Sequence, residues 1–315
     1  MCAARQGFVG FPGGLLLLLL CCCVSMLEAR ADTLRVATYN VKNYLVMDRM
    51  VAGQWKPEYP KPEAEKKIIR QVILECSPDI LVLQEIGGSG FLEELQRDLK
   101  QGGLDYAHAV LMRGVDETRH VAVLSHLKPR EVKQHRDLDF KYFDTRLTVK
   151  RGLLEVGFEL PGGEPFQLFA VHLKSRWSDE PRDPESQMRR TREAQACRDR
   201  IIERTLESGR AAYVVAGDFN DHPASAPLRR FYQRGDLELG SLLPAADRRG
   251  HVWTHYYQKH AAYTLVDGFV VSPAFLARIK GGEGHIADRP GVLSGSDHRM
   301  VYFDLKRPVA AGVKK

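Results

Sequence analysis

The stretch Tyr213-Val214-Val215-Ala216-Gly217-Asp218-Phe219-Asn220 decides how this chain folds. Its apolar, β-branched first half predicts a strand over residues 212–216. A glycine, an aspartate and an asparagine follow directly, at the point where the strand stops. Polar side chains that begin where an apolar strand ends are the pattern that the rest of the sequence repeats.

Further apolar runs predict strands over residues 34–39, 80–83, 121–124, 153–158, 166–171, 264–271 and 301–305. Polar residues stand beside these runs in the same way: Asn40, Glu85, His172, Asp267, Asp297 and His298. Singly, each has an ordinary explanation, because aspartate and asparagine form turns and a lone histidine is usually structural. All of these side chains stand where strand ends can converge. Burying so many polar groups in one place costs free energy unless a bound cation or pairing among the groups compensates it.

The composition of this set indicates its chemistry. It contains one glutamate, three aspartates, two asparagines and two histidines. Oxygen ligands favour Mg²⁺, Mn²⁺ or Ca²⁺ over zinc, which would want more nitrogen or sulfur. Hydrolysis of a phosphate ester needs a cation that neutralises phosphate charge and two groups that move protons, which histidines can supply.

Two amphipathic stretches predict the main helices. One begins at Glu63 and is stopped by Ser77-Pro78, and a basic one covers residues 186–206. The segment between the first strand and Glu63, which holds Trp55 and three prolines, reads as irregular. Many strands with few long helices favour two packed sheets with helices outside, whereas a parallel barrel would want a helix after nearly every strand.

The N-terminus predicts an export signal over residues 1–31. Arg5 is followed by an apolar run with six leucines at 15–20 and by Ala29-Arg30-Ala31, a small-residue cleavage pattern. We therefore expect a secreted or periplasmic protein cleaved near Ala31, with one domain over residues 32–310 and a short basic tail over 311–315. A retained anchor or a lipid-modified cysteine among residues 21–23 are the alternatives.

Removal of that signal leaves Cys76 and Cys197, so one disulfide is possible and a cysteine-stapled scaffold is excluded. The formal net charge of the full chain is +6, which is compatible with a polyanionic partner without establishing one. We expect a monomer with no membrane span in its mature form and no stable protein partner.

Two sets of side chains are open to two interpretations. The basic helix carries six arginines that favour a solvated face, with local pairs to glutamates, over a nucleic-acid track: Arg189, Arg190, Arg192, Arg198, Arg200 and Arg204. Four aromatic residues could stack on bases, although packing is the default: Trp55, Trp177, Trp253 and Tyr256.

At this point the residues resemble a known family. Six ordered motifs are similar to those of the endonuclease/exonuclease/phosphatase superfamily, which includes DNase I-like nucleases, bacterial sphingomyelinases and inositol polyphosphate phosphatases: Thr38-Tyr39-Asn40-Val41, Leu83-Gln84-Glu85-Ile86, Val171-His172-Leu173-Lys174-Ser175, Gly217-Asp218-Phe219-Asn220-Asp221, Val266-Asp267 and Ser296-Asp297-His298. The resemblance is closest to bacterial extracellular nucleases. It implies a four-layered α/β sandwich of two packed mixed sheets, with the active site at one edge.

The resemblance also implies roles for the residues. Glu85, with Asn40 and Asp297, resembles the metal site, which would hold Mg²⁺ or else Mn²⁺ or Ca²⁺. His298, oriented by Asp267, resembles one half of an acid/base pair, and the sequence does not decide which histidine is the base.

The remaining roles concern the phosphate. His172 resembles the other half of the acid/base pair, touching phosphate or the leaving group. Asp218 and Asn220 resemble the pair that positions the attacking water and stabilises the pentavalent phosphate. Arg151 resembles an arginine that secreted nucleases hold against phosphate, and a solvated charge at a strand start is the equal alternative.

One position departs from the pattern of DNase I-like enzymes. They place a glutamate near Arg119 to pair with the first histidine, but this chain has Thr118-Arg119-His120 there. The partner of His172 is therefore open, with Asp116 and Glu117 as candidates.

These features predict a secreted, divalent-metal-dependent phosphodiester hydrolase, with a nuclease that cuts DNA or RNA as the leading hypothesis. Action on lipid head groups or inositol phosphates is the alternative, although no exposed apolar hairpin of the sphingomyelinase kind is evident in the sequence. A non-catalytic binding protein on the same fold is a third hypothesis, and the complete set of polar residues argues against it.

Overall fold

A computed structural model describes residues 33–160 and 162–306, so the predicted signal peptide, its cleavage site and the basic tail lie outside the described residues. Two large mixed sheets form the body of this part of the chain. The first sheet has, in spatial order, β16 (Ala245–Ala246), β20 (Gly284–Ile286), β21 (Val301–Lys306), β1 (Thr33–Tyr44), β4 (Ile80–Ile86), β6 (His120–Ser125) and β5 (His108–Met112).

The second sheet packs against the first. Its strands are, in order, β15 (Ser241–Leu242), β19 (Asp267–Val271), β12 (Tyr213–Asp218), β11 (Pro165–His172), β10 (Leu153–Glu159) and β7 (Glu131–His135). β11 and β12 run parallel, and β12 and β19 run antiparallel. The end of β11, the end of β12 and the start of β19 therefore meet at one edge.

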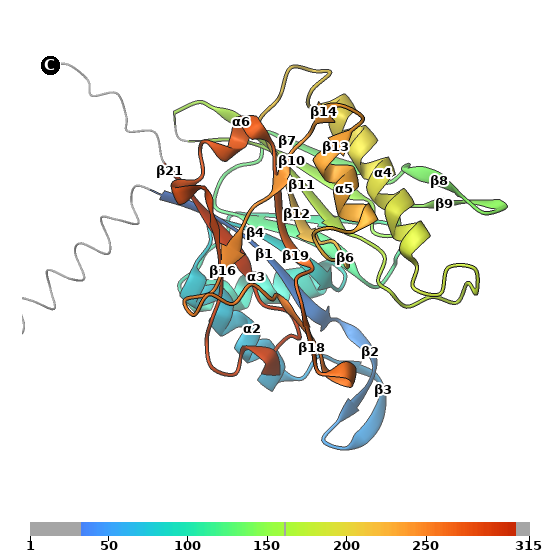
Figure 1. The fold of residues 1–315 in the computed structure, drawn as a ribbon. Helices are drawn as coiled ribbons and strands as arrows, with labels where there is room; N and C mark the ends of the chain where they lie inside the picture. The colour runs from blue at the N-terminus through green and yellow to red at the C-terminus, as the bar shows by residue number, and fades with distance from the viewer. Residues whose placement is uncertain (1–32, 161, 307–315) are drawn as a thin grey trace, which may run out of the picture.

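Helices cover both outer faces (Figure 1). α2 (Glu63–Cys76) and α3 (Ser89–Gln101) pack on the first sheet, and α4 (Gln187–Arg204) and α5 (Ala226–Tyr232) pack on the second. The predicted four-layered α/β sandwich is thus confirmed. Shorter helical elements also occur in this part of the chain: α6 (Pro273–Leu276), η1 (Gln258–His260), η2 (Lys280–Gly282) and η3 (Val292–Ser294).

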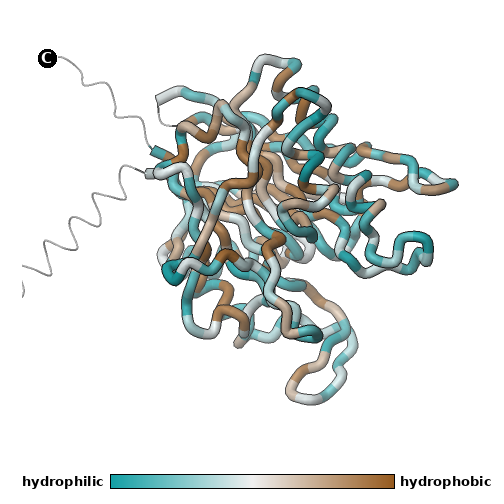
Figure 2. The backbone as a smooth tube through the Cα atoms, viewed as in Figure 1, coloured by the Kyte–Doolittle hydropathy of each residue, from teal (hydrophilic) through white to brown (hydrophobic). Residues whose placement is uncertain are grey.

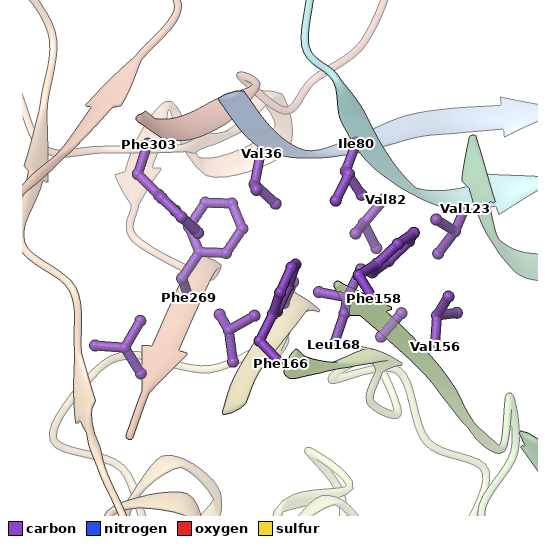
Figure 3. Packing of buried hydrophobic residues seen from close by; sticks show 14 of the residues in the cluster. Val36, Ile80, Val82, Val123, Val156, Phe158, Phe166, Leu168, Phe269 and Phe303 are labelled. Atoms are coloured by element: carbon purple, nitrogen blue, oxygen red, sulfur yellow. The ribbon is translucent and has the colours of Figure 1, made fainter. Parts of the chain in front are cut away.

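The main hydrophobic core lies between the two sheets. Val36 and Val82 of the first sheet face Phe166, Leu168 and Phe269 of the second, and all five are almost completely buried (Figure 3). Hydrophobic segments follow the central strands, whereas much of the periphery is hydrophilic (Figure 2). Burial of branched and aromatic side chains on two facing sheets thus holds the strand ends of both sheets in a fixed relation.

The segment predicted to be irregular is a β-hairpin, so that prediction was wrong. β2 (Val46–Val51) and β3 (Gln54–Pro60) pair as an antiparallel ribbon that projects from the body (Figure 1). Proline is tolerated here because the two-stranded ribbon has no further strand whose ladder a missing N–H would interrupt.

The tip of this hairpin is apolar and exposed, which corrects the expectation that no such hairpin exists. Met50 pairs with Trp55 across it, and their exposed fractions are 62% and 63%. The base is tied to the end of β1: Arg49 donates to the carbonyl of Asn43 (3.2 Å), and Lys61 Nζ donates to the carbonyl of Lys42 (2.8 Å).

Three other two-stranded ribbons lie outside the large sheets. They are β8 (Asp139–Tyr142) with β9 (Thr145–Thr148), β13 (Gln233–Arg234) with β14 (Leu237–Glu238), and β17 (His255–Tyr257) with β18 (Ala262–Thr264). Among residues 33–160 and 162–306, no helix is both long and apolar enough to cross a bilayer.

The basic helix α4 is not simply a solvated face, which corrects part of that interpretation. Arg190 and Arg198 are buried, and Arg190 donates to the buried Asp221 (2.8 Å). The expected local pair between Arg189 and Glu193 is present at 3.6 Å. α4 packs over carboxylates that lie beneath it, so part of its charge is internal.

The aromatic residues divide in two. Trp253 packs against Tyr263 in a tilted arrangement and lies under the guanidinium of Arg299, so it is a packing residue as expected. Trp177 is 71% exposed, and Trp55 is likewise exposed, so the packing default was wrong for both.

The two cysteines lie in opposite outer layers. Cys76 belongs to α2, on the first sheet, and Cys197 to α4, on the second. Two sheets separate them, so the structure holds no disulfide between them.

Gly217 allows the ends of β11 and β12 to approach closely, which a residue with a Cβ would prevent. Its φ is +148°, and a Cβ there would lie 2.0 Å from the carbonyl oxygen of Val171. We predict that Gly217→Ala lowers the free energy of unfolding by about 2 kcal/mol, because the parallel pair β11–β12 must separate. Chemical denaturation measures this, with Gly90→Ala in α3, where a Cβ meets open space, as the control. Equal stability of both variants would contradict the close-approach argument.

Candidate active site

One row of side chains comes from the second sheet. His172 pairs in register with Asp218, and Asp218 pairs in turn with Asp267. All three side chains are at least nine-tenths buried. Strand pairing alone therefore places a histidine between the sheets and two aspartates beside it, at the edge where β11 and β12 end.

The first sheet supplies Asn40 and Glu85 from the parallel pair β1 and β4. Asn40 Nδ2 donates to Asp218 Oδ2 at 2.9 Å, so this amide bridges the two sheets. Glu85 Oε2 accepts from the backbone N–H of Asn43 at 2.9 Å, and its Oε1 lies 3.8 Å from His172 Nε2.

His298 completes the arrangement from the segment before β21. Its Nδ1 donates to Asp267 Oδ2 at 2.8 Å, and its Nε2 lies 4.0 Å from Asp218 Oδ2. The hydroxyl of Ser296 donates to the carbonyl of Asn40 and accepts from the backbone N–H of His298. The serine of the Ser296-Asp297-His298 motif thus anchors the histidine loop to β1.

Asn220 lies in a tight turn after β12. Its φ is +54°, its backbone N–H donates to Asp218 Oδ1, and its amide donates to the carbonyl of Leu173. Glu85, Lys42 and Asn43 also have positive φ. Such conformations cost free energy in residues with a Cβ and gather at functional sites.

The two histidines have opposite electrostatic surroundings. Burial, then the charges of Arg151 and His298, hold the pKa of His172 well below its usual value. Burial would also lower the pKa of His298, but Asp267, Asp218 and Asp297 outweigh it and raise that pKa to about 10. At neutral pH one imidazole is therefore neutral and the other charged.

The pKa values of the two aspartates near His298 are also shifted, again in opposite directions. Burial and the neighbouring charge of Asp267 raise the pKa of Asp218 above its usual range. Burial pushes the pKa of Asp297 up as well, but His298 and Lys42 outweigh it and leave that pKa lowered. Asp297 Oδ2 lies 3.2 Å from Lys42 Nζ, so a cation already stands beside this carboxylate.

Within residues 33–160 and 162–306, two groups of closely spaced ligand atoms could hold a metal ion: His255, Asp297 and His298, and Asp218, Asp267 and His298. Neither is the predicted set of Asn40, Glu85 and Asp297. The second group consists of partners that already bond one another through the His298–Asp267 contact, so it is better suited to proton transfer than to coordination. The predicted set offers hard oxygen donors, which fit Mg²⁺, Mn²⁺ or Ca²⁺.

The sequence left the partner of His172 open, and neither candidate fills that place. Asp116 is buried against Arg151, with 3.1 Å from Asp116 Oδ2 to the guanidinium Nε, and Glu117 is exposed. The carboxylates nearest to His172 Nε2 are those of Asp218 (3.6 Å) and Glu85. Its Nδ1 has no hydrogen-bond partner among the described residues.

A cationic wall, which we define as Arg119, Lys150 and Arg151, lies on the His172 side of the site. All three contribute positive charge that lowers the pKa of His172. Asp116 holds them together: it accepts from the backbone N–H of Arg119 and lies 3.1 Å from Arg151 and 3.7 Å from Lys150. Arg151 is buried, and its Nη1 has no hydrogen-bond partner within the described residues.

Of the cationic wall only Arg151 was predicted to meet phosphate, and Asp116 was predicted only as a candidate partner of His172. The spacing of Asp116 and Thr118, whose backbone N–H donates to the aspartate, is a turn signal that could have been noticed. No local signal connects that turn with residues 150 and 151. His255 was missed as well; its ring packs on that of His298 with centroids 4.5 Å apart.

A model of the Endonuclease/Exonuclease/phosphatase family matches residues 37–298. An endonuclease/exonuclease/phosphatase from Bacteroides vulgatus is 17% identical, with 88% of this chain and 99% of that chain covered and a TM-score of 0.59. The human Nocturnin catalytic domain with bound sulfate is 16% identical (88% and 95% covered, TM-score 0.57). Sphingomyelinase C from Streptomyces griseocarneus is 17% identical (87% and 99%, TM-score 0.57). No curated protein matches the chain by sequence.

At these identities the solved structures show a shared fold. The family model covers most of both sheets and every predicted site residue from Asn40 to His298. The chain belongs to the endonuclease/exonuclease/phosphatase family, whose members are hydrolases.

Proposed function

We propose that this chain is an exported, divalent-metal-dependent phosphodiesterase that cuts DNA or RNA. The cationic wall beside His172 is the observation that carries the substrate class. Among the described residues, Asp116 is the one carboxylate within 4 Å of the charged groups of Lys150 and Arg151, and the guanidinium of Arg119 has none within that distance. Arg151 also keeps a buried donor without a partner among these residues. Buried donors of this kind are costly unless an anion satisfies them when the site is filled.

A nucleic-acid strand brings such anions on both sides of the bond that is cut. One phosphate would lie between the histidines, and a neighbouring phosphate would meet the cationic wall. A phosphocholine head group has one phosphate and, in place of a neighbouring phosphate, a quaternary ammonium, which the cationic wall would repel. The sign of the charge next to His172 therefore favours a polyanion.

The two histidines supply the proton transfers. Asp267 holds Nδ1 of His298, so Nε2 is the nitrogen that exchanges a proton with substrate or water. His172 Nε2 faces Asp218 and Glu85 from the other side. Asp218 and Asn220, fixed to each other through the Asn220 N–H, are placed to orient an attacking water between the two rings.

We assign Asn40, Glu85 and Asp297 to a divalent ion, with Mg²⁺ preferred and Mn²⁺ or Ca²⁺ as alternatives. When bound, such an ion neutralises phosphate charge and so helps to stabilise the transition state. Glu85 is suited to this because the Asn43 N–H fixes one of its oxygens and turns the other toward His172.

The β2–β3 hairpin favours a second candidate, a phosphodiesterase that acts at a lipid surface. Exposed Met50 and Trp55 at a projecting tip, with Lys56 next to Trp55, suit the interface of an anionic bilayer. The cationic wall argues against a choline head group, so we rank this candidate below the nuclease.

The histidine roles can be tested by substitution. We predict that His172→Ala and His298→Ala each lower kcat by at least about 100-fold, because each removes a group that transfers a proton. Steady-state hydrolysis of an oligonucleotide measures this, and His222→Ala, at a largely exposed histidine, serves as the matched control. Near-normal rates in both variants would end the proposed mechanism.

Metal dependence gives a second test. EDTA is expected to abolish hydrolysis, and Mg²⁺ or Mn²⁺ to restore it. Glu85→Gln is expected to raise the metal concentration needed for half-maximal activity by about tenfold or more, because a neutral amide is a weaker ligand for a hard cation than a carboxylate. Full activity in chelator would refute the assignment.

A substrate panel tests the preference for nucleic acid. Plasmid DNA, RNA, inositol phosphates and sphingomyelin vesicles are compared in saturating metal, and we predict that nucleic acid is cut fastest. Lys150→Glu is expected to raise KM for an oligonucleotide by about tenfold, since it reverses one charge of the cationic wall. Lys128→Glu, beyond the far end of β6, is the control. Preferred cleavage of vesicles, lost in Trp55→Ala, would establish the second candidate instead.

A further inference from the structure

Most arginines of α4 are neutralised by a carboxylate. Arg190 pairs with Asp221 (2.8 Å) and Arg204 with Glu155 (2.8 Å). Arg189, Arg198 and Arg200 also have acidic partners within 4 Å. These five contribute little positive field, because each charge is compensated where it stands.

Three exposed arginines of α4 and α5 differ from this pattern, and they line neighbouring hollows of the surface. Arg192 of α4 and Arg229 and Arg230 of α5 have no acidic partner within 4 Å among the described residues. Arg192 reaches only the side chain of Gln195 (3.4 Å), and Arg229 only the carbonyl of Ala224 (2.7 Å). All three are exposed. The uncompensated charge of the α4–α5 layer is therefore concentrated on one strip of surface.

This strip is hollowed. A cavity of about 330 Å³ is lined by Arg198, Arg229, Arg230 and Arg234, and a neighbouring one of about 410 Å³ is lined by Arg192 and again Arg230. Ala226 and Arg230 line both cavities, so the two are neighbours on the surface. We call this surface the α4–α5 groove; α4 and α5 lie side by side where it runs (Figure 1).

Asp183 lines the groove and Asp199 lies beside two of its arginines, and both carboxylates are engaged. Asp199 lies 2.7 Å from Arg198 and 3.9 Å from Arg234. Asp183 accepts from the backbone N–H groups of Met188 and Arg189 at the start of α4. Among the residues that line the two cavities there are thus five arginines and one aspartate, Asp183, and that aspartate is turned toward a helix end.

Helix electrostatics explains only part of the set. Arg229 and Arg230 stand in the last turn of α5, where cations are favoured. Arg192 lies inside α4 and Arg234 follows α5, so no helix end accounts for their convergence on the same groove. From Met188 to Arg198 the groove follows α4 for roughly 15 Å, the axial length of about four phosphates of one strand.

We propose that the α4–α5 groove is an accessory binding track for the phosphate backbone of a nucleic-acid strand, outside the active site. This inference rests on the proposed function, because the same strand would enter the site. The two regions are joined through Arg190, which ties α4 to Asp221, the residue after Asn220. The occupant is a polyanionic chain and not a single small anion, because the arginines are spread along two neighbouring cavities.

The test compares two charge reversals of equal size. Arg229→Glu/Arg230→Glu alters the groove, and Arg248→Glu/Arg249→Glu alters an adjacent exposed pair near β16 of the other sheet. Binding of fluorescent single strands of about 8 and about 30 nucleotides is followed by anisotropy in EDTA, so that the strands are bound without being cut. Hydrolysis of bis(p-nitrophenyl) phosphate reports on the catalytic centre.

The groove variant is expected to bind the long strand at least about tenfold more weakly than wild type, with the slope of log K against log salt reduced by about 2. The short strand, the control variant and the hydrolysis of the small diester are expected to change little. Equal losses in both variants, or none in the groove variant, would overturn the track. If wild type cuts the small diester but neither binds nor cuts nucleic acid, the proposed function fails and the track fails with it.

Discussion

A hydrogen bond of 2.9 Å from the amide of Asn40 to the carboxylate of Asp218 joins the two sheets at the edge where their strands end. Both groups are buried, so neither can exchange this partner for water without cost. The rest of the site is arranged around this bond. Asp218 lies between the two histidines, and the carbonyl of Asn40 receives the serine that anchors the His298 loop. Packing of the core sets the distance between the sheets, and the hydrogen bond from Asn40 to Asp218 holds their edges together at the site.

The same carboxylate separates two electrostatic environments. On one side His298 lies among three aspartates and holds a proton; on the other His172 lies beside the cationic wall and does not. The pKa values of the two imidazoles are thereby shifted in opposite directions by their neighbours. A pair of proton-transfer groups needs this difference, because a donor and an acceptor must not share one protonation state.

The sequence predicted the central strands of both sheets, their polar ends and the layered architecture, since each depends on local patterning that alternates or repeats over a few residues. It also predicted that His172, Asp218 and Asp267 would converge, because each stands at the boundary of an apolar run. The edge strands β5 and β7 were not predicted. The pairing of Asp116 with Arg151 could not be predicted in this way, since two loops bring it about. The burial of Arg190 depends likewise on Asp221 lying beneath α4. The β2–β3 hairpin was missed because its prolines are read as breakers, which holds in a central strand but not in an isolated ribbon.

The base of that hairpin shares its backbone with the site. Arg49 and Lys61 donate to the carbonyls of Asn43 and Lys42, and the N–H of Asn43 holds Glu85. The tip lies far out in solvent while its base grips two residues in left-handed backbone conformations. The hairpin and the carboxylate of Glu85 thus depend on the same two residues of backbone, so a change at the base of the hairpin would alter the position of Glu85.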